Sequence, residues 1–192
     1  MRRTQERQAA SRAAAVIRPV HSADLAALSD FFAGLSAQTR YLRFFGPVTP
    51  GPVLLRVLSG CSEHTEAVIA VRGGVIIGHG LAADQAGPGG TRMTDIGVVV
   101  ADAWQRRGVG SALIRALVAG AQARGVTSLA MEVLPHNYQV LAMIKGHWPG
   151  SRIGHDRDGV TFRVDLPRYQ QRHAPARPLW TSDAFHELPE SA

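Results

Sequence analysis

The sequence has little cysteine, little lysine and no long apolar run, and each shortage excludes a class of protein. Its single cysteine, Cys61, excludes an internal disulfide and fits a reducing compartment. Its single lysine, Lys145, does not stand in a G-x-x-x-x-G-K-[ST] pattern, which excludes a Walker A phosphate loop. No run approaches the ~18 apolar residues of a membrane span, and Arg12 interrupts the apolar stretch that a secretory signal needs. We therefore expect a cytoplasmic protein.

Length and composition favour one globular domain. The chain has 192 residues, of which 45% are hydrophobic, enough for one domain with a sizeable core. We expect this domain at residues 15–167, between a flexible arm at 1–14 and a disordered or partner-bound tail at 168–192. The net charge is +6, almost wholly from arginine. Because the arginines are scattered and a polyanionic cofactor also attracts them, we do not expect nucleic acid as the partner.

Residues 96–118 indicate a strand, a glycine turn and a helix. The strand is the short β-branched run at 96–100, and apolar residues recur at helical spacing from Val109 to Ala121. Between them lies the sequence QRRGVG at 105–110, a Q-x-x-G-x-G turn. Gly125 stands where a left-handed residue would end the helix.

The start of this helix is suited to bind a phosphate group. A first helical turn has unpaired N–H groups and a partial positive charge, and Gly108 and Gly110 let a ligand approach the backbone. Arg106 and Arg107 add positive charge at the same place. A dinucleotide fingerprint is disfavoured, because Leu113 occupies the third glycine position and several residues separate the strand from the turn. We interpret the turn as a pyrophosphate-binding site.

The string VVVADAWQRRGVGSALI resembles the acetyl-CoA signature of the GNAT superfamily of N-acetyltransferases, [QR]-x-x-G-x-[GA] after a strand. The likeness extends over roughly residues 16–166. It implies a mixed α/β fold, with a central, mostly antiparallel sheet that has one splayed parallel pair and is flanked by helices. It also implies acetyl-CoA as co-substrate, held by backbone groups of the turn and of the preceding strand. The cofactor-binding residues that it implies are Val98, Val99, Val100, Gln105, Arg106, Arg107, Gly108, Val109, Gly110, Ser111 and Asn137.

A second string, SAQTRYLRFF at residues 36–45, resembles the start of the acetyltransferase domain in bacterial protein-lysine acetyltransferases. This resemblance implies a protein lysine as the acceptor, and a small-molecule amine is the alternative. Tyr41, Phe44 and Phe45 equally fit a helix core. Arg40 and Arg43 are expected to be solvated or to face the substrate.

Asp95 is the expected catalytic residue. In the resembling lysine acetyltransferases, a glutamate at this place acts as general base in an E-x-x-[FV]-x-V-x-D-A-x-Q pattern. Residues 95–105 match that pattern with aspartate for glutamate, and the shorter side chain calls for a bridging water. The alternative for Asp95 is a strand-end carboxylate in an ion pair. Glu132, on the following strand, is either a second base or an ion-pair partner.

The acid that protonates the leaving thiolate is open. Many members of the family carry a tyrosine seven residues after the asparagine that matches Asn137, and this chain has Ile144 there. Either the thiolate leaves without that acid, or Tyr138, His136 or Tyr41 takes its place. The histidines lack metal-ligand spacing, so we expect no metal. Asn137 also fits a simple turn or cap.

Periodicity and turn residues predict the remaining elements. Strands are expected at 16–20, 67–71, 75–81, 91–100 and 127–133, with two more in 154–166 around a charged turn. Helices are expected after a cap at Ser22, after a cap at Ser36, at 53–58, from 109 and at 138–145. The strand, helix and strand from 91 to 133 form a βαβ unit, so the two strands should be parallel.

These patterns lead to an enzyme that moves acetyl from acetyl-CoA to a primary amine by direct attack in a ternary complex. GNAT domains often dimerise, so a homodimer is a further expectation. The alternative is a catalytically weak acetyl-CoA-binding module with a regulatory role. Aspartate at position 95 and isoleucine at position 144 motivate that alternative.

Overall fold

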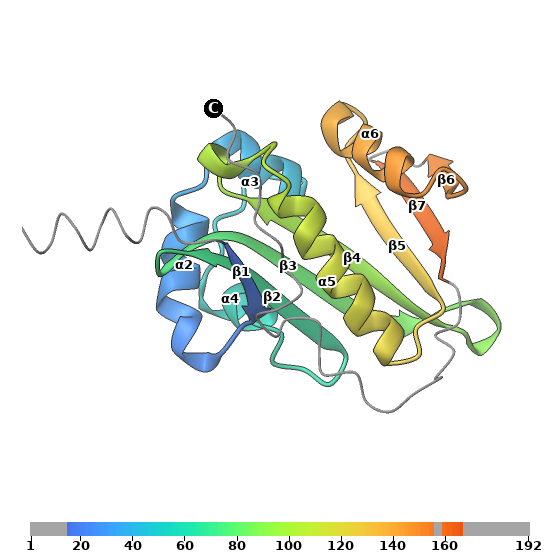
Figure 1. Ribbon diagram of the computed structural model, residues 1–192, viewed down its shortest axis with the longest axis horizontal. Coiled ribbons are helices and arrows are strands. Elements are labelled where there is room, and N and C mark those ends of the chain that lie inside the picture. The colour runs from blue at the N-terminus through green and yellow to red at the C-terminus, as the bar shows by residue number, and fades with distance from the viewer. Residues whose placement is uncertain (1–14, 156–158, 167–192) are drawn as a thin grey trace, which may run out of the picture.

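A seven-stranded sheet in the order β1-β2-β3-β4-β5-β7-β6 runs through the protein (Figure 1). This computed structural model describes residues 15–155 and 159–166, and the arm and tail expected at 1–14 and 168–192 lie outside them. The strands are β1 (Val16–Pro19), β2 (Thr65–Arg72), β3 (Val75–Ala86), β4 (Arg92–Val100), β5 (Ser128–Val133), β6 (Arg152–His155) and β7 (Val160–Asp165).

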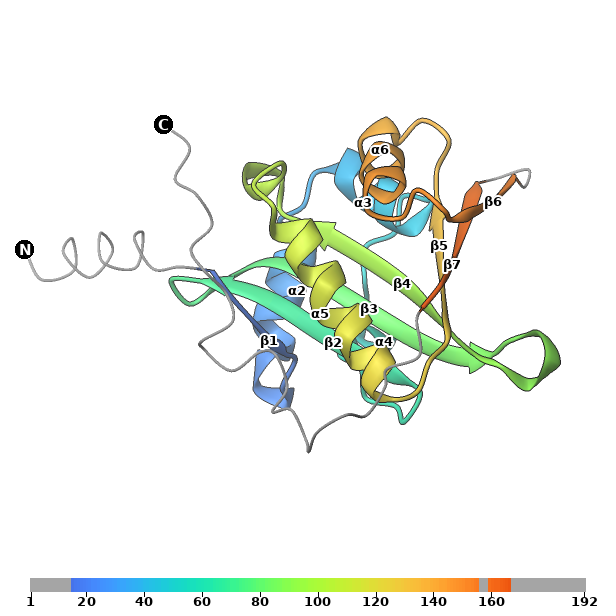
Figure 2. The same ribbon diagram turned by 45° about the vertical axis from the view of Figure 1, so that its right-hand side comes forward.

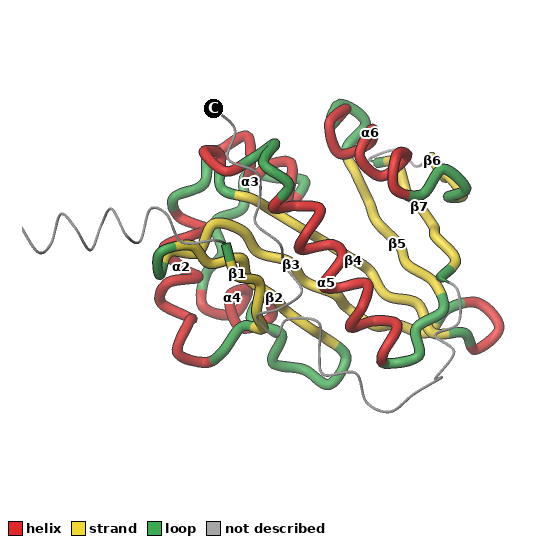
Figure 3. Tube along the Cα trace, viewed as in Figure 1, coloured by secondary structure: helices red, strands yellow, loops and turns green. Residues whose placement is uncertain are grey.

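Helices cover both faces of the sheet (Figures 1 and 3). One face carries α2 (Leu25–Ala33), α3 (Ala37–Phe44) and α4 (Pro52–Leu58), and the other carries α5 (Val109–Ala123) and α6 (Tyr138–His147). Short 3₁₀ segments lie at η1 (Ser22–Asp24), η2 (Pro88–Gly90) and η3 (Asp102–Trp104). Within the described part of the chain, no helix has the length and apolar character needed to cross a membrane.

Alternation along the strands creates two apolar clusters, one on each face. On the α5 face, Leu113 and Leu117 are fully buried and pack closely on β3. A Cβ atom at Gly78 would lie 3.0 Å from Leu113 Cδ1, and one at Gly80 would lie 2.9 Å from Leu117 Cδ1. Glycine at these two positions therefore lets α5 approach the sheet. On the other face, Phe32 packs in the cluster of α2 and α4.

β4 and β5 are the parallel neighbours, and they pair over only three residues each. Their register runs from Met93 with Ser128 to Asp95 with Ala130. Beyond Asp95, β4 continues to Val100 on β3 alone, while β5 continues on β7. Figure 2 shows β5 and β7 turning away from β4. This separation confirms the predicted mixed sheet with one splayed parallel pair.

Several local predictions are confirmed. The hairpin of β2 and β3 turns at residues 72–74, and Gly125 ends α5 with φ +78°. Ser36 caps α3, because its Oγ accepts a hydrogen bond from the Thr39 N–H at 3.1 Å. α4 begins one residue earlier than expected, with Pro52 at its first turn. The charged turn expected before β7 falls largely on residues 156–158, outside the described residues.

The predicted cap at Ser22 is wrong. Ser22 opens η1, and α2 begins only at Leu25. Asp24 replaces it as the organising side chain: it accepts from the His21 N–H at 2.8 Å and takes two hydrogen bonds of 2.7 Å from Arg18. A bidentate charged pair is stronger than a serine cap, and Arg18 comes from β1, so a local pattern could not reveal it.

Candidate active site

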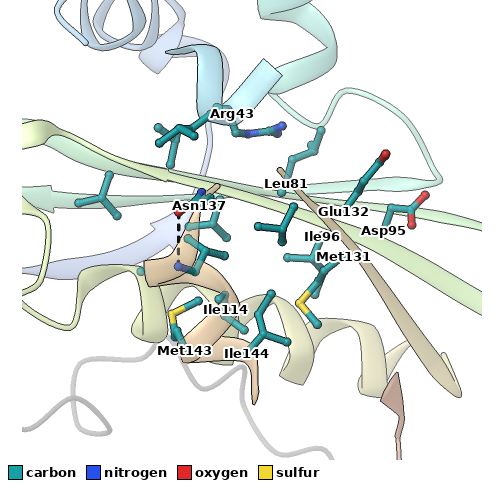
Figure 4. Close-up of a pocket in the computed structure, with 18 of the residues that line it drawn as sticks. Arg43, Leu81, Asp95, Ile96, Ile114, Met131, Glu132, Asn137, Met143 and Ile144 are labelled. Carbon is teal, nitrogen blue, oxygen red and sulfur yellow. Dashed lines mark hydrogen bonds between the residues drawn. The ribbon is translucent and has the colours of Figure 1, made fainter. Parts of the chain in front are cut away.

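A cavity of about 1040 Å³ opens where β4 and β5 separate (Figure 4). Its walls come from α3, β3, β4, β5, β7, the turn at 105–111 and α6. Figure 4 shows Asp95 and Glu132 together in one part of the cavity and Asn137 and Met143 in another, with the Arg43 side chain between these two groups. The fold thus brings the glycine turn and two carboxylates to a single space.

The glycine turn has the backbone geometry of a phosphate site. Arg106 and Gly108 take left-handed conformations, with φ +60° and +80°, and α5 begins directly afterwards. The N–H groups in the first turn of a helix have no intrahelical acceptor. Gly108, the N-cap residue, has no side chain that could accept from them instead. A Cβ atom at Gly110 would meet only Val100 Cγ2, at 3.7 Å, which leaves its other side open. These features fit an anion at the helix N-terminus.

The structure brings most of the expected cofactor-binding residues to the cavity. Those that line it are Val98, Val99, Val100, Gln105, Arg106, Gly108, Gly110, Ser111 and Asn137. Two expected residues point elsewhere. The Arg107 guanidinium lies over the Trp104 ring, 5.2 Å from its centroid. The Val109 side chain is buried in the core under α5, so only its backbone remains for a ligand.

Gln105 and Asn137 both hold protein structure as well as lining the cavity. Gln105 Nε2 donates to the Val100 carbonyl and to Thr39 Oγ1, each at 3.1 Å. Asn137 Oδ1 accepts from the Val140 N–H at 3.4 Å and so caps α6. Asn137 is therefore the N-cap of α6, which was one of its two expected roles. The other role, contact with the pantetheine arm of the cofactor, stays a prediction.

Asp95 lies at the last paired position before β4 and β5 separate. Its carboxylate accepts a hydrogen bond from Gln85 Nε2. Desolvation is the largest cause that raises the pKa of Asp95; the charge of Glu132 adds to it, while Arg163 and Gln85 oppose it. A carboxylate with a raised pKa is a stronger base than a free one, as proton abstraction requires.

Glu132 lines the same cavity, beyond the last β4–β5 pair. It does not form an ion pair with any residue that the structure describes. A Cβ atom at residue 159 would come within 3.0 Å of Glu132 Oε1, so glycine there leaves room for the carboxylate. The described residues thus do not support the ion-pair alternative for Glu132, and its role as a second base stays a prediction.

Ile144 does not place an acid in the cavity, and neither do the three residues that were considered as replacements for the missing tyrosine. Ile144 is buried and lines the cavity with an apolar side chain. Tyr138 is 76% exposed, and Tyr41 stacks on His136 with ring centroids 6.2 Å apart. None of these three is among the described residues that line the cavity.

The sequence left the role of Arg43 undecided, and the fold places it in the cavity against Gly97 of β4. Arg40, one turn earlier, instead donates to the backbone carbonyls of Ala33 and Leu35. The contact of Arg43 with Gly97 joins residues 54 apart in the chain, so the sequence could not predict it. The string at 36–45 was the only local pattern that pointed to a role for Arg43.

Comparison with known proteins agrees with this geometry. The model of the Acetyltransferase (GNAT) family matches residues 37–147. The GNAT domain of PAT from S. lividans is similar at 27% identity and a TM-score of 0.70, over 78% of this chain and 89% of that one. A ribosomal-protein-alanine N-acetyltransferase from Brucella melitensis shares the fold (18% identity, TM-score 0.64, 79% and 99% covered). So does a phosphinothricin acetyltransferase from Sinorhizobium meliloti in complex with acetyl-CoA (16% identity, TM-score 0.65, 86% and 94% covered).

Proposed function

Since this chain belongs to the acetyltransferase (GNAT) family, we propose that it transfers acetyl from acetyl-CoA to a primary amine by direct attack in a ternary complex. The observation that carries this proposal is the position of Asp95, at the point where β4 and β5 separate and in one cavity with the glycine turn. A base and a phosphate site at the two ends of one cavity suit a thioester donor and an amine acceptor.

The glycine turn is the part of the chain that would hold the co-substrate. Unpaired N–H groups from Val109 to Ser111 and the charge of Arg106 would bind the pyrophosphate. The carbonyl and N–H groups of Val98 and Val100 that face away from β3 would pair with the pantetheine arm, since β5 has left that edge of β4. Acetyl-CoA supplies an activated acyl group when bound there.

Asp95 would take the proton from the acceptor amine, directly or through one water. The amine nitrogen forms a bond to the acetyl carbonyl carbon, the carbon–sulfur bond breaks, and the electron pair leaves on sulfur as a thiolate. The nitrogen loses its second proton to solvent as the amide forms, and solvent protonates the thiolate, because the apolar Ile144 supplies no acid to the cavity. Glu132 adds negative charge that attracts an ammonium group to the same place.

The acceptor is either a protein lysine or a small-molecule amine. The string at 36–45 supports the first. The likeness to a phosphinothricin acetyltransferase supports the second. With either acceptor, we propose that residues 15–167 form the acetyltransferase domain.

Replacement of Asp95 tests the mechanism. Thiol release from acetyl-CoA is measured with a panel of amines and lysine peptides. Asp95→Asn should lower kcat about 10²- to 10⁴-fold, the usual contribution of a general base, with acetyl-CoA affinity unchanged. Asp30→Asn on α2 is the control, because Asp30 is exposed and is not one of the residues that line the cavity.

The outcomes separate the two functional classes. Turnover that falls only in Asp95→Asn supports an acetyltransferase. Acetyl-CoA binding without turnover of any amine or peptide, in wild type as in Asp95→Asn, would instead support the acetyl-CoA-binding regulatory module.

A further inference from the structure

The cavity contains a cation that has no anionic partner within the described protein. Arg43 projects from the last turn of α3 into the cavity. Its Nε atom is buried and lacks a hydrogen-bond partner among the described residues. No ion pair joins its guanidinium to a carboxylate in that part of the chain, and its Cζ atom lies over the Phe44 ring, 5.2 Å from the centroid.

Other arginines of this protein form ion pairs with carboxylates or lie close to one. Arg18 is held by Asp24, and Arg124 by Asp84 and Glu66. Arg163, which also lines the cavity, is close enough to Asp95 to lower the pKa of that carboxyl group. Arg43 thus differs from these arginines although two carboxylates line the same cavity.

The chain makes specific room for the Arg43 guanidinium. A Cβ atom at Gly97 would lie 2.6 Å from Arg43 Cζ and Nη2 and 2.8 Å from Nη1. Any other residue at position 97 would therefore displace the guanidinium. Gly97 follows Asp95 by two residues, so both lie on the same face of β4. The cation therefore lies on the same face of β4 as the proposed base, over the second residue after it, where β4 and β5 have begun to separate.

Desolvation of Arg43 has a physical consequence. It lowers the pKa of the guanidinium to about 10, so the group is still charged at neutral pH. A charge that has lost part of its water without gaining a counter-ion is unfavourable, and an anion that binds it relieves that penalty. A planar guanidinium binds a carboxylate best, through two parallel hydrogen bonds.

We propose that Arg43 selects an acceptor that carries an anionic oxygen group close to its reactive amine. The inference rests on the proposed acetyl transfer and names the acceptor's chemical class. Asp95 and Glu132 receive the ammonium end, and Arg43 receives the anionic end. A carboxylate of this kind has two sources: the acceptor is a free amino acid, or it is a lysine with an aspartate or glutamate beside it in a peptide.

Matched acceptor pairs test this selection in the full chain. Free lysine is compared with cadaverine, and phenylalanine with phenethylamine, which lack only the carboxylate. The peptide arm compares acetyl-Asp-Lys-Ala-amide with acetyl-Asn-Lys-Ala-amide. Each pair is measured for kcat/KM in wild type, in Arg43→Met and in Arg56→Met, an exposed arginine on α4 that serves as charge control.

The expected result is at least a tenfold preference for the carboxylate-bearing member of one arm. The preference should disappear in Arg43→Met and persist in Arg56→Met. Acetyl-CoA affinity should stay the same in all three proteins, and Arg43→Met should melt at or above the temperature of wild type, because it removes an unpaired, partly buried charge. Gly97→Ala, which displaces the guanidinium, should reduce the preference as Arg43→Met does.

Equal turnover of both members in every pair would overturn the proposal. So would an equal loss on both members in Arg43→Met, since Arg43 would then act on the co-substrate or on the fold. If no acceptor is turned over, the acetyl-transfer proposal fails by itself. Calorimetry of the same pairs on the protein saturated with CoA then decides, because Arg43-dependent binding of the carboxylate member supports the selection and its absence refutes it.

Discussion

His79 is a buried titratable side chain whose pKa is affected by the charge of Arg43. It lies on β3, fully buried, and its Nε2–H donates to the Leu58 carbonyl at 2.7 Å. Desolvation, and then the charge of Arg43, lower the pKa of His79 to about 3. The ring is therefore neutral at every pH at which the protein is expected to work. Its Nδ1 has no hydrogen-bond partner among the described residues, so protonation would place a second cation beside Arg43.

We predict that His79 makes the protein sensitive to mild acid. Its pKa is near 6.5 in the unfolded chain and about 3 in the folded one, so below pH 6.5 the unfolded state binds the proton more readily. The free energy of unfolding should therefore fall as pH falls, by about 2 kcal/mol between pH 6.5 and 5. Urea unfolding at several pH values measures this slope.

His79→Gln should flatten the acid slope, because glutamine keeps a donor for the Leu58 carbonyl but does not titrate. The exposed His64 provides the control, since His64→Gln should leave the slope as in wild type. An unchanged slope in His79→Gln would show that other groups cause the acid sensitivity.

At the scale of elements, Asp102 joins the proposed acceptor side of the site to the proposed cofactor side. This residue opens η3, three residues before the glycine turn. It accepts hydrogen bonds from the Ser36 N–H at 3.0 Å, from Ser36 Oγ at 2.6 Å and from Thr39 Oγ1 at 2.7 Å. The N-terminus of α3, the helix that carries Arg43, is thereby fixed to the segment that leads into the glycine turn.

Removal of this carboxylate should loosen both halves of the site. Asp102→Ala removes three hydrogen bonds, and water can replace the partner of the exposed Ser36 but less readily that of the buried Thr39, so we expect about 1 kcal/mol lower stability in denaturant unfolding. The KM values for acetyl-CoA and for the acceptor should rise together, because α3 and the turn lose the same contact. Asp102→Asn keeps one acceptor oxygen and should be intermediate. A rise in only one KM value would contradict the coupling.

Elements whose causes are local were predictable from the sequence. β4, the glycine turn and α5 are consecutive, and their pattern gave the parallel pair and the ligand site. The cap at Ser36 and the turn at Gly125 also depend on nearby residues. In contrast, β3 continues to Ala86, well beyond the expected end at Leu81, because its last residues pair with β4. Residues 82–86 have no strand pattern of their own that reveals this pairing.

The parts of the site that were missed depend on contacts between distant residues. Arg43 lies over Gly97 and Asp102 binds Ser36, and neither pair is visible before the chain is folded. The type of chemistry could thus be predicted from residues 95–110, whereas the surroundings of the acceptor required the structure.

At the scale of the whole molecule, the site joins two layers that lie on opposite faces of one sheet. α5 and the glycine turn lie on one face, while α3 with Arg43 lies on the other. The separation of β4 from β5 connects the two faces through the cavity. A co-substrate held on the α5 side could therefore present its acyl group to an acceptor that enters from the α3 side.

The central claim is that the glycine turn binds the pyrophosphate of acetyl-CoA, and calorimetric titration of acetyl-CoA tests it most directly. Three proteins are titrated: wild type, Gly108→Glu and Gly125→Glu. Both glycines have left-handed backbones, with φ +80° and +78°, so the two variants carry the same conformational strain and charge at opposite ends of α5. Wild type and Gly125→Glu should bind, and Gly108→Glu should not. Equal binding by all three, or no binding by wild type, would contradict the account.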